Sequence, residues 1–133
     1  MVIMNVLITG VSGVDGAILA GRLVDQECTV FGVSRRTGGD LEKIRDELTS
    51  VEAVYSVDLA DLASVQDLIS SLNLDVIFHL SGQSSVGLSF ESPQKAYASM
   101  LFPIVNLLEA VRNVSPKTRV VHASSSECFG NCE

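Results

Sequence analysis

Short apolar runs alternate with longer amphipathic stretches along most of the chain. The apolar runs predict buried strands at residues 2–9, 29–33, 51–57, 75–80 and 118–123. Apolar positions at helical spacing predict helices at residues 14–26, 41–48, 61–72 and 93–114. Asp61 is the expected cap of the third helix. The alternation predicts an α/β fold with a parallel, doubly wound sheet and right-handed crossovers.

Pro103 lies inside the last predicted helix. Proline cannot donate its backbone nitrogen and costs about 3 kcal/mol in a helix interior. We therefore expect the helix either to begin at Pro103 or to bend there.

Composition narrows the class of protein. A chain of 133 residues fits one domain, residues 1–133. The net charge of −7 argues against nonspecific nucleic-acid binding, although a local basic cluster can still hold a small anion. No secretory signal and no long apolar run is present, so we expect a cytoplasmic protein without a membrane partner.

Cysteine and histidine do not suggest a metal site. Cys28, Cys128 and Cys132 are odd in number and lack metal-ligand spacing, so reduced thiols are expected. His79 and His122 each lie in a predicted strand. We expect both to be structural, each with a local partner, and no metal to be bound.

A glycine-rich turn follows the first predicted strand and opens the first predicted helix. Glycine at 10 permits a tight turn, glycine at 13 leaves room for a pyrophosphate, and glycine at 16 lets the helix pack close to the sheet. The helix start offers free N–H groups to an anion. A glycine turn without a ligand is the alternative. The expected cofactor contacts are Gly10, Ser12, Gly13, Val14, Asp15 and Gly16.

The end of the second strand selects the nicotinamide cofactor. An acidic residue there suits the ribose hydroxyl of NAD, whereas arginine suits the 2′-phosphate of NADP. This chain has Ser34, Arg35 and Arg36, with no carboxylate before Asp40. An arginine fork matches phosphate geometry, so we expect NADP rather than NAD. A solvated basic turn is the alternative.

Two further strand ends complete the predicted cofactor site. Asp58 and Leu59 follow the third strand, where the carboxylate could accept from the adenine amino group or serve as a cap. The fourth strand ends in small residues, which leave space where open α/β sheets bind ligands. The expected contacts there are Leu80, Ser81, Gly82 and Gln83.

These residues also carry a resemblance. The sequence resembles the GDP-mannose 4,6-dehydratases, a branch of the extended short-chain dehydrogenase/reductases, over nearly its whole length. Val-Asp-Gly at 14–16 and Ser-Ser-Glu at 125–127 are the segments most specific to this branch. The other matching segments are 8–10, 34–36, 82–87, 90–93, 107–110, 123–124 and 129–130.

The resemblance implies a Rossmann-type fold and an intramolecular redox dehydration of a nucleotide-linked hexose, catalysed by a lyase. NADP would take hydride from sugar C4, water would leave across C5 and C6, and hydride would return at C6. Ser125 corresponds to the hydroxyl that binds the C4 oxygen, and Glu127 to the acid/base at C5. The alternatives are a strand-end residue that caps local backbone for Ser125 and a solvated loop carboxylate for Glu127.

The chain also departs from the family. In the family, the tyrosine of a Tyr-x-x-x-Lys pair takes the hydroxyl proton during hydride transfer. Neither Tyr55 nor Tyr97 has a lysine four positions on, so this pair is absent. We therefore expect an incomplete Rossmann domain without the sugar-binding part. The family usually has Asn or Asp, then Gly and Thr, where this chain has Met100, Pro103 and Ile104.

Three functions follow from the sequence. The first is the cofactor-binding half of an NADP-dependent dehydratase that acts on GDP-mannose, inactive alone and expected to form a homo-oligomer. The second is an epimerase or 4-keto reductase of the same superfamily. The third is a non-catalytic dinucleotide-binding module.

Overall fold

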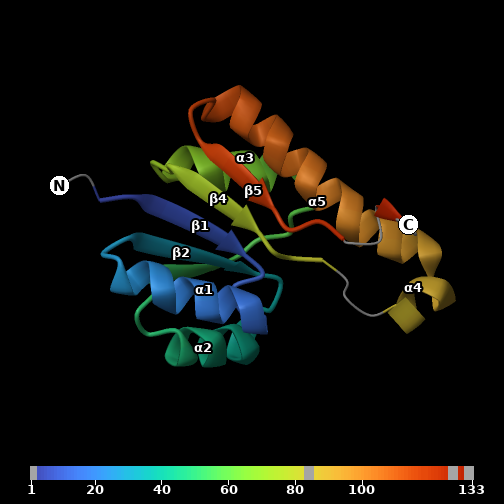
Figure 1. Ribbon diagram of the computed structural model, residues 1–133, viewed down its shortest axis with the longest axis horizontal. Helices are drawn as coiled ribbons and strands as arrows, with labels where there is room; N and C mark the ends of the chain where they lie inside the picture. Colours follow the sequence, from blue (N-terminus) through green and yellow to red (C-terminus); the bar gives the residue numbers. More distant parts are fainter. Residues whose placement is uncertain (1–2, 83–85, 126–128, 131–133) are drawn as a thin grey trace.

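The computed structural model describes residues 3–82, 86–125 and 129–130. Five parallel strands form one sheet in the order β3-β2-β1-β4-β5 (Figure 1). The strands are β1 (Asn5–Thr9), β2 (Thr29–Ser34), β3 (Ala53–Ser56), β4 (Val76–His79) and β5 (Arg119–His122). The helices are α1 (Val14–Asp25), α2 (Gly38–Glu47), α3 (Leu62–Ser71), α4 (Val86–Glu91) and α5 (Pro93–Val114). The predicted doubly wound sheet is confirmed; helix α4 was not predicted.

Helices cover both faces of the sheet, with one layer on each face. Side chains alternate between the faces of a strand, so Leu7 and Ile8 of β1 enter different cores. Leu7 packs with Leu107 of α5 in the core that also contains α3 residues. Ile8 packs with Ala20 of α1 and Ile44 of α2 in the other core. Strand β1 lies between β2 and β4, so the strand order reverses at its carboxyl end, where such sheets bind ligands.

Helix α3 begins as the sequence predicted. The Asp61 carboxylate accepts a hydrogen bond from Ser64 N at 3.2 Å, which satisfies a free donor of the first turn. Hydrogen bonds from the Ser64 side chain and backbone also hold the pKa of Asp61 below its ordinary value. Asp61 is therefore the N-cap.

Helix α5 begins at Pro93 and continues through Pro103. The expectation that it could begin at Pro103 is wrong. Proline is well suited to the first turn of a helix, so Pro93 provides the start. Pro103 is buried on the same face as Ala96, Leu107 and Ala110. Packing on both sides of the proline thus holds the two halves in one element.

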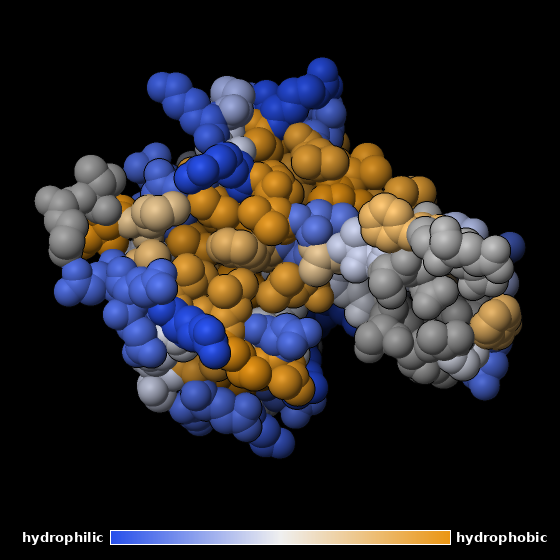
Figure 2. Space-filling model, in the orientation of Figure 1, coloured by the Kyte–Doolittle hydropathy of each residue, from blue (hydrophilic) through white to orange (hydrophobic). Residues whose placement is uncertain are grey.

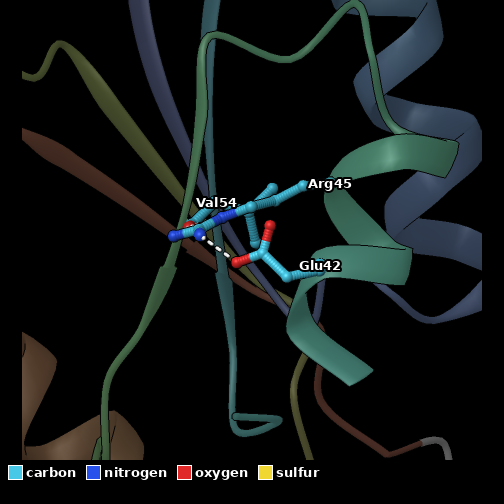
Figure 3. A network of polar contacts seen from close by, with 3 residues as sticks. All are labelled: Glu42, Arg45 and Val54. Atoms are coloured by element: carbon cyan, nitrogen blue, oxygen red, sulfur yellow. Dashed lines mark hydrogen bonds and ion pairs between the residues drawn. The ribbon is translucent and has the colours of Figure 1, made fainter. Parts of the chain in front are cut away.

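The free edge of the sheet at β3 is tied to α2 by one arginine. Arg45 donates to Val54 O through Nε at 3.2 Å and Nη2 at 2.9 Å. Its Nη1 also lies 2.8 Å from Glu42 Oε1 in an ion pair (Figure 3). The guanidinium therefore satisfies a carbonyl at a sheet edge, where an unpaired backbone group would invite other strands.

The opposite edge leaves apolar surface open. Apolar side chains gather over the centre of the face seen in Figure 2. Val121 of β5 is 47% exposed and pairs with Phe78, which is half-buried.

No helix within the described residues has the length and apolar character needed to cross a membrane.

Candidate functional site

The glycine turn joins β1 to α1 and closes against β4. Gly10 has a φ of 76°, a region that glycine enters without steric cost. A Cβ on Gly10 would lie 2.9 Å from Ser81 N. A Cβ on Gly16 would collide with the Gly10 carbonyl oxygen and lie 2.8 Å from Val11 Cα. Gly16 therefore permits the helix to approach the turn itself, which refines the expected approach to the sheet.

The start of α1 presents unpaired donors. Gly13 is the N-cap residue and has no side chain that could cap the first N–H groups of the helix. Ala17 N donates to Gly13 O at 2.9 Å in the first helical bond. The N–H groups of Val14, Asp15 and Gly16 precede it and make no hydrogen bond with the described residues. Three such donors and the positive end of the helix dipole fit a phosphate group.

A cavity of about 410 Å³ lies over this turn, at the carboxyl ends of β1, β2 and β4. We call it the glycine-loop cavity. Its volume is in the range of small-molecule sites. The lining contains every residue that the sequence predicted within the glycine turn. The residues that line it are Gly10, Ser12, Gly13, Val14, Asp15, Gly16, Val33, Ser34, Arg35, Leu59, Leu80, Ser81 and Gly82.

The end of β2 brings one arginine to this cavity. Ser34 is buried, and its Oγ accepts a hydrogen bond from Arg36 N at 3.2 Å. This bond turns the chain as it leaves the strand. Arg35 lines the cavity, whereas Arg36 lines neither this cavity nor the next one described. Of the two arginines that the sequence predicted as cofactor contacts, only Arg35 lines a cavity.

A second cavity of about 240 Å³ adjoins the first, and we call it the α5-side cavity. Asp58 lines it, and its Oδ1 accepts from Ala60 N at 2.9 Å. The carboxylate therefore stabilises the turn after β3 and also faces the cavity. The lining is Arg35, Asp58, Leu59, Ala60, Ser81, Gly82, Lys95, Ala98, Ser99 and Pro103.

A buried histidine joins the two strand ends that frame the glycine turn. His79 Nδ1 lies 2.7 Å from Thr9 Oγ1 and 3.3 Å from Ser81 Oγ, and the two hydroxyl oxygens are 3.1 Å apart. The tautomer sets the direction of the bonds to the ring. His79 Nε2 is buried without a partner among the described residues. Thr9 precedes Gly10, and Ser81 lines both cavities. This triangle therefore helps to position both walls.

The surroundings of His79 fix its charge. Burial, and secondarily the neighbouring His122, lower the pKa of His79 to about 4. The two rings stack with centroids 5.1 Å apart. The expected local partners of both histidines are present, although His122 is exposed. The described residues contain no group of ligands suited to a metal ion.

The remaining predicted residues divide between described and undescribed parts. Ser125 follows β5, is exposed, and lines neither cavity. Glu127 and Gln83 lie outside the described residues. Cys28 is a free thiol, and Cys128 and Cys132 lie outside the described residues.

Sequence reasoning missed the contribution of α5. Lys95, Ala98, Ser99 and Pro103 line the α5-side cavity. Asn106 also donates from Nδ2 to Leu59 O at 2.9 Å, which ties α5 to the turn after β3. The available signal for Asn106 was that it is the one polar residue in the apolar segment 100–108.

A model of the GDP-mannose 4,6-dehydratase family matches residues 7–133. A GDP-mannose 4,6-dehydratase from Yersinia enterocolitica is 34% identical, over 93% of this chain and 36% of that protein. A GDP-mannose 4,6-dehydratase from Sinorhizobium fredii is 32% identical, over 93% of this chain and 38% of that protein. The chain thus spans somewhat over a third of the length of these curated relatives.

Among solved structures, the chain is similar to a UDP-glucose 4-epimerase from Stenotrophomonas maltophila. That structure contains NAD and a formylated UDP-arabinopyranose. The TM-score is 0.82 at 25% identity, and the match covers 98% of this chain and 39% of the epimerase. The likeness extends over nearly the whole of this chain and supports the same fold.

Proposed function

The chain belongs to the GDP-mannose 4,6-dehydratase family, and we propose that it is the cofactor-binding part of an NADP-dependent nucleotide-sugar 4,6-dehydratase. The proposed substrate of the whole protein is GDP-mannose, because this is the nucleotide sugar named for the curated relatives. The 4,6-dehydratases are lyases. The proposed assembly is a homo-oligomer.

The observation that carries the proposal is the glycine-loop cavity at the reversal of strand order. Three backbone donors at the start of α1 belong to its lining. Backbone close to Gly10 and Gly16 leaves no room for side chains there. Such a site accepts a pyrophosphate, with one nucleoside half extending toward Arg35.

Arg35 supports NADP over NAD. It follows Ser34 at the end of β2, where the adenosine ribose of a dinucleotide is expected. No carboxylate in the described residues forms an ion pair with Arg35. The guanidinium is therefore available to a 2′-phosphate. The proposed adenine position lies at Asp58 and Leu59, next to the α5-side cavity.

The proposed chemistry divides between cofactor and protein. Bound NADP would supply a hydride acceptor and donor. The proposed role of Ser125 is to hydrogen-bond the sugar C4 oxygen. The proposed role of Glu127 is to remove the proton at C5, which a carboxylate can do as a general base. Ser125 follows β5, at the sheet edge where the carboxyl ends of the strands meet.

Titration of the chain with NADPH and NADH tests the cofactor proposal. We expect tighter binding of NADPH, and loss of that preference in Arg35→Ala. Arg22→Ala is the matched control. Arg22 is also exposed and forms no ion pair with a described residue, but it lies in α1, outside both cavities. Equal affinities, or tighter binding of NADH, would contradict the proposed preference for NADP. Absence of binding by either nucleotide would contradict the dinucleotide site.

An epimerase is the second candidate, favoured by the likeness to the UDP-glucose 4-epimerase. Both reactions use the same cofactor site, so only the products separate them. The full-length protein, given GDP-mannose, should form a 4-keto-6-deoxy sugar nucleotide. Recovery of a C4 epimer instead would favour the epimerase.

A further inference from the structure

The α5-side cavity combines an apolar wall with two cationic side chains. Leu59, Ala98 and Pro103 contribute apolar surface. Arg35 and Lys95 contribute positive charge, and Asp58 contributes one carboxylate, which accepts a hydrogen bond from Ala60 N. The cavity shares Arg35, Leu59, Ser81 and Gly82 with the glycine-loop cavity. One extended ligand can therefore occupy both.

No described residue forms an ion pair with either of the two cations. The described residues provide neither a hydrogen bond nor an ion pair to the side chain of Arg35 or Lys95. By contrast, Lys43, Arg45 and Arg112 each pair with a carboxylate. Arg35 and Lys95 are two of only nine basic residues in a chain of net charge −7. Asp58 lines the same cavity but forms no ion pair with either cation among the described residues. Two cations against one carboxylate leave the cavity with a positive balance, which favours an anionic ligand.

The structure holds Lys95 at this cavity through the packing of α5. Ala96 is buried, and its N–H donates to Ser92 O at 3.0 Å. Pro103, two turns further along, is buried as well. Asn106 donates from Nδ2 to Leu59 O, which ties α5 to the turn after β3. Lys95 thus has a fixed backbone and a flexible, exposed side chain.

We propose that Lys95 and Arg35 together bind the 2′-phosphate of NADP, Arg35 from the end of β2 and Lys95 from α5. Lys95 would then take the role in phosphate binding that was predicted for Arg36, which lines neither cavity. The start of α1 is the site for the pyrophosphate, which leaves the 2′-phosphate as the second anion. This inference rests on the proposed function.

The test compares affinities for NADPH and NADH in four proteins: the unchanged chain, Lys95→Met, Lys95→Arg and Lys117→Met. Methionine keeps the unbranched stem of lysine without its charge. Lys117 is also exposed and forms no ion pair within the described part of the chain, but it precedes β5 and so lies at the opposite end of the strands. Thermal melts verify that each variant folds.

We expect Lys95→Met to weaken NADPH binding about tenfold, as a charge-assisted contact is lost, and to leave NADH binding unchanged. Lys95→Arg should retain the preference, and Lys117→Met should match the unchanged chain. An equal loss for both nucleotides, or no loss, would overturn the role of Lys95 while leaving the proposed cofactor intact. No preference in the unchanged chain would instead overturn the NADP assignment and this inference with it.

Discussion

At the scale of single residues, the burial of His79 predicts a pH-dependent stability. Its folded-state pKa of about 4 lies below the ordinary value of 6.5. Between these values the unfolded chain binds more protons than the folded chain. The contribution of His79 to the free energy of unfolding is therefore fully present above pH 6.5 and is lost as the pH falls toward 4. The expected loss in the free energy of unfolding is about 3 kcal/mol.

Urea denaturation at several pH values from 7 to 4 measures this effect against His79→Leu. Carboxylates also titrate near pH 4, but they do so in both proteins, so the difference in slope isolates the histidine. Leucine leaves Thr9 Oγ1 with its Ser81 partner. Parallel pH profiles of the two proteins would show that His79 does not carry the dependence.

At the scale of elements, the two glycines of α1 should respond in opposite ways to alanine. A methyl group on Gly16 meets rigid backbone of Gly10 and Val11, whereas a Cβ on Gly21 meets no atom within 4 Å. Gly16→Ala should cost about 1–3 kcal/mol by overpacking and should weaken NADPH binding. Gly21→Ala should stabilise the chain by up to about 1 kcal/mol, because alanine is the better helix former.

Chemical denaturation and NADPH titration of both variants provide the measurement. The pair shares one helix and one chemical change, so propensity alone would move both in the same direction. A stabilised Gly16→Ala with normal NADPH affinity would refute the close approach of α1 to the glycine turn.

At the scale of the whole molecule, the 133 residues by themselves should not turn over substrate. Hydride transfer from a hydroxyl carbon requires a base for the hydroxyl proton, and the chain has no Tyr-x-x-x-Lys pair. An unassisted serine such as Ser125 is a poor base. The chain also spans only somewhat over a third of the length of its relatives. Without the part that positions the substrate, roughly 7–11 kcal/mol of barrier lowering can be lost.

The measurement is an incubation of the purified chain with NADP and GDP-mannose, assayed for the 4-keto product. We expect no product above a blank without protein. Product that persists after contaminating dehydratase has been excluded would show that these residues suffice for catalysis.

The sequence by itself determined the sheet and the glycine turn, because both depend on local patterns. Apolar runs separated by helical periodicity predicted the five strands, and Asp61 was identified as a cap from its neighbours alone. Spacing of the glycines predicted a turn whose close contacts are now visible at Gly10 and Gly16. In each case the interactions that form the feature join residues close in sequence or belong to the regular pairing of strands.

Only the tertiary structure decided which side chains from distant elements share a cavity. It brought Lys95 of α5 to the same cavity as Arg35, and it left Arg36 outside both linings. It also joined Thr9 and His79, which are 70 positions apart, by a hydrogen bond. Helix packing sets these meetings through the rotation and depth of α5 on the sheet, which depend on the burial of Pro103 and Leu107. No local pattern encodes that rotation, so the second cavity could not be read from the chain alone.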